Sequence, residues 1–158
     1  MRASARHMSR LKIDEPRAFS IVAKNRFLNH VGYKQDKFSE ITKSILGCCF
    51  EVMNELGSGF LEKIYQNALI VALCERSLDV STGKSFEVLF RGRQIGVFVP
   101  DLIVEKQVII ELKTCEHLSG EHPAQLINYL AVTNLSVGLL VNFGKRKLEY
   151  KRVYHPAM

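Results

Sequence analysis

The 158-residue sequence predicts an α/β domain in which helices cover a central mixed β-sheet. Two segments with helical apolar spacing come first, and three segments typical of strands follow them. A further helix then precedes a nearly continuous apolar strand. A strand, a helix and a strand in succession predict a crossover between parallel neighbours, while short turns between the earlier strands predict antiparallel pairs.

Two amphipathic helices are predicted in the first half of the chain. Apolar residues recur at helical spacing from Ile41 to Leu56, and Gly57-Ser58-Gly59 should end this helix because glycine adopts the left-handed conformation readily. We expect order to begin near Asp36 or Ser39, either of which can cap a helix. The second helix has one apolar stripe, made of Leu61, Ile64, Tyr65, Ala68, Leu69, Ala72 and Leu73.

The second half of the chain is predicted to contain most of the sheet. Alternating apolar residues at 86–90 lead into an Arg-Gly-Arg hairpin turn, and further strands are expected at 95–104 and 108–113, around the charged turn 105–107. Pro123 suits the first turn of a helix that runs to about Val132. The last two strands are predicted at 137–143, buried on both faces, and at 147–154.

The net charge of +6 is concentrated near the N-terminus. Residues 1–37 contain nine Lys or Arg and three Asp or Glu, whereas residues 38–158 contain thirteen of each kind. We therefore expect a basic, flexible N-terminal extension over 1–37 and a folded domain over 38–158. The extension either binds phosphate backbones by counterion release or is only a solvated leader.

Composition argues against two classes of protein. No apolar run approaches the ~18 residues that span a bilayer, so we expect no membrane partner and a cytoplasmic protein. The cysteines at 48, 49, 74 and 115 lack the spacing of zinc or iron–sulfur sites, and we expect reduced thiols that serve as small core residues.

One group of polar residues stands on the predicted strands. Side chains alternate along a strand, so Glu111 and Lys113 share a face. Asp101 and Glu111 lie at equal separations from Lys106, the middle of the predicted turn, and symmetric pairing would set their Cα atoms about 4.5–5.5 Å apart. Facing carboxylates on an apolar sheet are costly, and a divalent cation such as Mg²⁺ or Mn²⁺ would neutralise both. A plain ion pair with Lys113, or a shifted register, is the alternative.

Two helical pairs could complete such a site. Glu62 and Tyr65 are three residues apart and share a helix face, although Glu62 could serve only as a first-turn acid favoured by the helix dipole. Gln125 and Tyr129 are four apart and also share a face, although each could be an ordinary boundary residue.

These residues resemble a known family. Pro100-Asp101, followed after nine residues by Glu111-Leu112-Lys113, resembles the signature of the PD-(D/E)XK nuclease superfamily. Gly59, Glu62 and Tyr65 match the motif that names the GxxExxY family, a bacterial-type branch of that superfamily. The resemblance covers about residues 39–154 and also includes the stretches 101–104, 110–113, 125–130 and 138–144.

The resemblance implies a restriction-endonuclease-like core and metal-dependent hydrolysis of phosphodiester bonds in nucleic acid, with DNA favoured over RNA. Asp101 and Glu111 would bind one Mg²⁺ or Mn²⁺, with the Leu112 carbonyl as a backbone ligand and Glu62 as an outer ligand. Lys113 would orient the attacking water or help to deprotonate it.

Gln125 and Tyr129 would brace the site or contact the substrate backbone. The alternative function is a non-catalytic nucleic-acid-binding module, or an accessory subunit of a repair or defence complex with the same fold. Whether the chain acts as a homodimer or with a partner protein is left open by the sequence.

Overall fold

The computed structural model describes residues 36–155, so the predicted basic extension lies outside the described residues except for its last two positions. None of the helices within 36–155 is long and apolar enough to cross a membrane. The elements in chain order are α1 (Asp36–Leu56), α2 (Glu62–Glu75), β1 (Val80–Ser81), β2 (Phe86–Phe90), β3 (Arg93–Phe98), β4 (Leu102–Val104), β5 (Val108–Lys113), α3 (Glu121–Thr133), β6 (Val137–Asn142) and β7 (Glu149–Tyr154).

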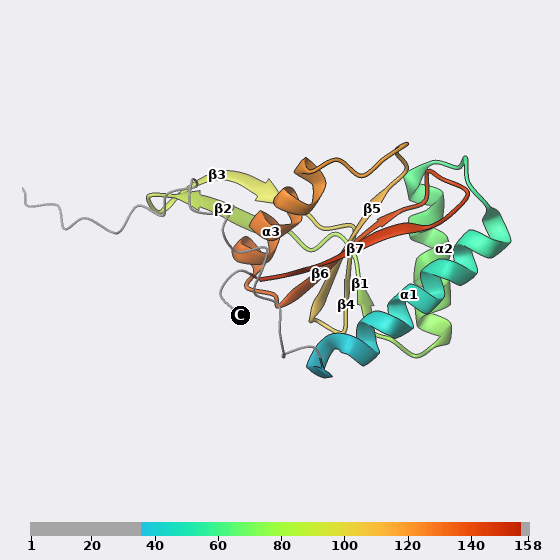
Figure 1. The fold of residues 1–158 in the computed structure, drawn as a ribbon. Coiled ribbons are helices and arrows are strands. Elements are labelled where there is room, and N and C mark those ends of the chain that lie inside the picture. Colours follow the sequence, from blue (N-terminus) through green and yellow to red (C-terminus); the bar gives the residue numbers. More distant parts are fainter. Residues whose placement is uncertain (1–35, 156–158) are drawn as a thin grey trace, which may run out of the picture. The chain divides into compact units, whose positions relative to one another are not determined.

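A five-stranded mixed sheet lies at the centre, in the order β1-β4-β5-β6-β7 (Figure 1). Strands β5 and β6 are parallel and are joined through α3, as predicted, whereas the other neighbouring pairs are antiparallel. Helices α1 and α2 pack on one face of the sheet and α3 packs on the other. This arrangement confirms the predicted α/β class and agrees with a restriction-endonuclease-like core.

Side-chain alternation along β5 divides the core into two parts. Val108, Ile110 and Leu112 belong to the larger cluster, which includes the buried residues of α1 and α2. Ile109 belongs to the smaller cluster beneath α3. Because Glu111 has the same parity as Ile109, its side chain lies on the α3 face of the sheet. Strand β6 is buried along its whole length, as predicted for a continuous apolar run.

The prediction of one strand over 95–104 is wrong. Strand β3 ends at Phe98 and pairs with β2 in a separate two-stranded sheet, and β4 begins only at Leu102. Pro100 lies in the interval, where a strand cannot continue its ladder because proline has no N–H to donate. The expected three-strand meander is therefore divided between two sheets. Its first hairpin packs against α3, and the short β1 forms the edge of the central sheet instead.

Smaller corrections concern the second helix and the cysteines. Helix α2 begins at Glu62, and two members of its predicted apolar stripe, Leu61 and Ile64, are exposed. Its buried residues are Tyr65, Leu69 and Leu73. Cys48 and Cys49 are buried as expected, and the half-buried Cys115 packs against the smaller cluster, but Cys74 is exposed and does not serve the core.

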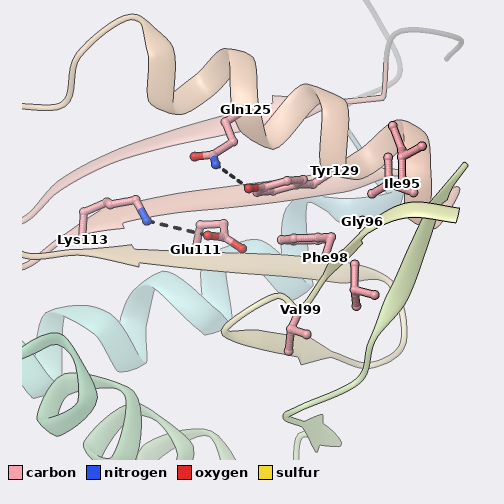
Figure 2. A pocket seen from close by; sticks show the side chains of 10 residues that line it. Ile95, Gly96, Phe98, Val99, Glu111, Lys113, Gln125 and Tyr129 are labelled. Atoms are coloured by element: carbon pink, nitrogen blue, oxygen red, sulfur yellow. Dashed lines mark hydrogen bonds and ion pairs between the residues drawn. The ribbon is translucent and has the colours of Figure 1, made fainter. Parts of the chain in front are cut away.

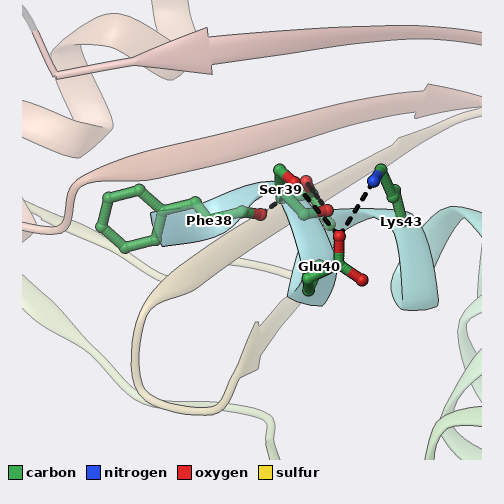
Figure 3. Close-up of polar contacts among 5 residues, drawn as sticks. Phe38, Ser39, Glu40 and Lys43 are labelled. Atoms are coloured by element: carbon green, nitrogen blue, oxygen red, sulfur yellow. Dashed lines mark hydrogen bonds and ion pairs between the residues drawn. The ribbon is translucent and has the colours of Figure 1, made fainter. Parts of the chain in front are cut away.

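Helix α1 ends at Leu56, where Gly57 takes the predicted left-handed conformation with φ of 70°. Near its start the hydroxyl of Thr42, which is fully buried, donates a hydrogen bond of 2.7 Å to the Phe38 carbonyl. Figure 3 shows the same turn, with Lys43 pairing with Glu40 at 2.9 Å on the exposed surface. An ion pair so open to water adds little stability, so the buried hydroxyl is the more important contact.

Gly138 on β6 controls how closely α3 approaches the sheet. A Cβ atom built at this position would lie 2.8 Å from three side-chain carbons of Leu126, which is itself buried. We predict that Gly138→Ala lowers the free energy of unfolding by about 1–3 kcal/mol, because overpacking displaces α3. Urea denaturation measures the free energy of unfolding. Gly120→Ala is the matched control, because nothing lies within 4 Å of a Cβ atom built at that glycine. Equal unfolding midpoints for the two variants would contradict the prediction.

Candidate active site

The register of β4 on β5 brings the two predicted carboxylates together. Leu102 pairs with Ile110 and Val104 with Val108, so the pairing is symmetric about Lys106, as predicted. Asp101 immediately precedes β4, and this register continued by one residue sets it opposite Glu111.

Asp101 is held from two directions. Its Oδ2 accepts a hydrogen bond of 2.8 Å from the Leu112 N–H, and its backbone carbonyl accepts one of 2.7 Å from Gln66 on α2. The Lys113 carbonyl accepts from the Phe143 N–H at 2.8 Å, on the β6 side. Because successive carbonyls of a strand point to opposite sides, the Leu112 carbonyl points toward the side of Asp101.

Glu111 is an unusual charged group for a sheet interior. Only 8% of the residue is exposed, and burial raises the pKa of its carboxyl to about 7, with the nearby Asp101 adding to the rise. Lys113 opposes that rise, and its Nζ lies 3.8 Å from Glu111 Oε2. The other oxygen, Oε1, is buried without a hydrogen-bond partner. A buried carboxylate oxygen left in this state is costly unless something else binds it.

Glu62 approaches the same charges from the first turn of α2. Burial raises the pKa of its carboxyl, Lys113 opposes the rise, and Asp101 adds to it. The charge of Glu62 is therefore coupled to those of Lys113 and Asp101, and its place in the acidic group stays a prediction. The charge of Glu62 in turn raises the pKa of Glu111, so the charges of the three acids and Lys113 interact with one another.

Tyr65 holds the turn from which Glu62 starts. Its hydroxyl donates to the Gly57 carbonyl at 2.8 Å and accepts from the Phe60 N–H at 3.2 Å. The ring is fully buried and stacks on Phe143 with centroids 4.6 Å apart. Gly59 has φ of 114°, which side-chain-bearing residues rarely adopt. Tyr65 thus packs and orients the turn, as expected, rather than reaching the charges.

A pocket of about 430 Å³ adjoins the acidic group, and Figure 2 shows its lining. Glu111 and Lys113 meet Gln125 and Tyr129 of α3 along one wall, and the Gln125 amide donates a hydrogen bond to the Tyr129 hydroxyl. Burial, followed by the charge of Glu111, raises the pKa of the Tyr129 hydroxyl. Asp101 and Glu62 are not among the residues that line the pocket.

Sequence reasoning missed the opposite wall, which comes from the β2–β3 hairpin. Phe98 stacks on Tyr129 with ring centroids 3.5 Å apart and planes inclined by 13°. The remaining lining residues of this wall are Val88, Ile95, Gly96, Val97 and Val99. These residues fall within the single strand predicted over 95–104, so the sequence alone gave no sign that they line a pocket.

Several oxygens near Glu111 could take a hard cation. They are the unpartnered Oε1, the Asp101 carboxylate and the Leu112 carbonyl, all of which are donors that Mg²⁺ and Mn²⁺ accept. Within residues 36–155 no group of three or more His, Cys, Asp and Glu side chains is arranged to hold a metal ion. Two carboxylates with backbone and water oxygens are nevertheless a common Mg²⁺ environment.

Comparison with known proteins supports the resemblance at the level of the superfamily. A family model described as the PD-(D/E)XK nuclease superfamily matches residues 39–153. The chain belongs to this superfamily. In this PD-(D/E)XK chain, Asp101, Glu111 and Lys113 gather at the ends of two adjacent strands.

No curated protein matches the chain. A solved structure titled "Crystal structure of SSO0001" is 22% identical, with a TM-score of 0.46, over 75% of this chain and 59% of that one. The PD-(D/E)XK chain thus spans less than two thirds of the length of that protein.

The raised pKa of Glu111 predicts how stability changes with pH. The folded protein binds this proton more tightly than the unfolded chain, so stability without metal should fall as pH rises from 4.5 to about 7. The fall is at most about 3 kcal/mol. Glu111→Gln removes the titrating group, and urea denaturation in a chelator across this range should show a flatter profile for the variant. Parallel profiles for the two proteins would show that Glu111 titrates normally.

Proposed function

We propose that this chain is a metal-dependent nuclease that hydrolyses phosphodiester bonds in nucleic acid, with DNA as the preferred substrate. The observation that carries the proposal is the buried Glu111 carboxyl, whose Oε1 has no partner although Asp101 and Lys113 are close. A purely structural ion pair would leave no such oxygen and would gain nothing from a second acid nearby.

The spacing of Gly59, Glu62 and Tyr65 supports a more specific assignment to the GxxExxY branch of the superfamily. Each residue has a separate physical task in this arrangement. The glycine permits the turn, the tyrosine holds it, and the glutamate reaches the field of the other acids.

Asp101 and Glu111 would hold Mg²⁺ or Mn²⁺, with the Leu112 carbonyl as a backbone ligand and Glu62 as an outer ligand. A bound divalent cation polarises a phosphate oxygen and lowers the pKa of its water. The hydrogen bond from the Leu112 N–H fixes one oxygen of Asp101, so this carboxylate is oriented before any ligand arrives.

Lys113 is placed to act on the reacting phosphate. Its side chain is 24% exposed and lines the pocket, so the ammonium group borders both Glu111 and open space. It would position the attacking water and offset the negative charge that builds on the phosphate. Because Gln125 donates to the Tyr129 oxygen, the hydroxyl hydrogen of Tyr129 can be donated to a phosphate oxygen of the substrate.

Separate losses of metal binding and cleavage test the proposed roles. We expect Lys113→Ala to retain Mn²⁺ binding in calorimetry while cleavage of DNA falls at least about 100-fold, because the metal ligands remain. Asp101→Asn should lose both properties. Lys106→Ala is the matched control, since this lysine is 85% exposed on the β4–β5 turn and should change neither.

The outcomes of this experiment separate the functions. Wild-type protein that binds Mn²⁺ but leaves plasmid, single-stranded DNA and RNA intact would favour a non-catalytic or accessory role. Cleavage by Asp101→Asn at the wild-type rate would refute the proposed site.

A further inference from the structure

The hairpin wall of the pocket exposes apolar side chains to an extent that needs an explanation. Ile95, Val97 and Val99 are 67%, 52% and 50% exposed, and all three line the pocket. Strand β3 pairs only with β2 among the residues that the structure describes, so this wall is also a free strand edge. Adjacent exposed apolar residues on an edge strand favour aggregation, and where they persist they commonly mark a ligand surface.

The two walls differ in chemistry. Glu111, Lys113, Gln125 and Tyr129 provide charge and hydrogen bonds on one side, whereas the hairpin provides aliphatic surface on the other (Figure 2). A ligand that satisfies both walls must carry a charged or polar part next to a flat apolar part. An unpaired nucleotide has this character, because its phosphate is charged and the faces of its base are apolar.

A base-paired duplex fits the pocket poorly. Its bases are stacked inside, and its outer surface is the charged sugar–phosphate backbone. A duplex phosphate beside Lys113 would therefore bring polar backbone against Ile95 and Val97. An unstacked base would instead cover these side chains and remove their surface from water. The volume of about 430 Å³ lies within the range of about 300–1,000 Å³ that small ligands occupy.

Two cations in or next to the hairpin can attract the phosphates of the bound nucleic acid outside the pocket. The Arg91 guanidinium, in the hairpin turn, lies 5.1 Å from the Phe90 ring centroid, and the Lys84 ammonium, just before the hairpin, lies 5.3 Å from that of Phe86. Both cations lie outside the pocket lining. Positive charge beside aromatic side chains is the usual composition of sites for single-stranded nucleic acid. The attraction to phosphates needs no base sequence.

The wall is formed before the ligand arrives. An isolated two-stranded hairpin is only marginally stable in water. Here Phe98, which is 6% exposed, stacks on Tyr129 of α3, and Val88 packs against the same cluster. The hairpin is thereby fixed to the helix that carries Gln125, so both walls keep their positions.

We propose that this pocket receives the base of an unpaired nucleotide adjoining the scissile phosphate, so that the substrate class is single-stranded DNA, including overhangs and flaps of longer DNA. The proposal rests on the proposed nuclease function in one respect, because only that function makes the phosphate next to this base the scissile one. Recognition of the base itself depends only on the hairpin wall, and it can therefore be tested by binding alone.

The experiment compares oligodeoxythymidine with an abasic deoxyribose-phosphate oligomer of equal length and with a duplex. Binding is measured by fluorescence anisotropy in Ca²⁺, and cleavage of the oligodeoxythymidine and the duplex is measured in Mn²⁺. The test variant is Ile95→Ser/Val97→Ser, whose two positions are exposed enough to tolerate serine. The matched control is Leu89→Ser, which is 57% exposed on the same hairpin but does not line the pocket.

Wild type and Leu89→Ser should bind oligodeoxythymidine about tenfold more tightly than the abasic oligomer, in line with the usual contribution of one base contact. The double variant should bind both equally and should lose its preference for the single strand over the duplex. Circular dichroism and size-exclusion chromatography check that the variant is folded and unchanged in oligomeric state.

Three outcomes would overturn the proposal. The wild-type protein could bind the two oligomers equally, or the double variant could keep the wild-type preference for oligodeoxythymidine. The double variant could also differ from wild type only in its self-association and not in its binding of the oligomers. Each of these can occur while cleavage persists, in which case the nuclease function stands and only the substrate class is wrong. Base-dependent binding without any cleavage would have the opposite meaning, because the pocket would be right and the nuclease function would fail.

Discussion

The antiparallel register of β4 on β5 is the constraint on which the site depends. It places Asp101 opposite Glu111, and a slip by one residue would turn every side chain of β4 to the other face. The apolar residues of β4 make such a slip very unfavourable, because Leu102 and Val104 would leave the core beneath α1 and α2. The hydrophobic core thus holds two acids at a closeness that their own charges oppose.

The surrounding structure supports this arrangement from both faces of the sheet. Gln66 on α2 binds the Asp101 carbonyl, and the Tyr65 hydroxyl fixes the turn that presents Glu62. At the far end of β5 the fully buried Asn142 binds both backbone groups of Cys115, at 3.1 Å and 2.8 Å, and so ties the strand ends together. These contacts involve neutral groups, which cost less to bury than charges do. These supporting contacts thus add no buried charge to that of Asp101, Glu111, Glu62 and Lys113.

The sequence was sufficient to predict the central layers of the fold. Strong patterns specified β5, the crossover helix and β6, and symmetry about Lys106 specified the register that joins Asp101 to Glu111. The hairpin wall could not be predicted in the same way. The alternating pattern at Ile95 and Val97 is the same for a strand that covers a core and for one that faces a pocket. The two-residue period follows from the pleated backbone and does not depend on what packs against each face. Only the tertiary packing of Phe98 on Tyr129 distinguishes the two cases.

Pro100 connects that error with the site. By interrupting the ladder it separates β3 from β4, which allows the hairpin to leave the central sheet and pack beside α3. The same interruption leaves Asp101 just outside the strand, where its side chain, rather than a backbone carbonyl of β4, accepts from the Leu112 N–H. A continuous strand would have satisfied that N–H by ordinary pairing and would have brought Val99 into the sheet. The local departure from regular pairing thus creates both the oriented carboxylate and the apolar wall, as expected where a fold gives up regularity for a site.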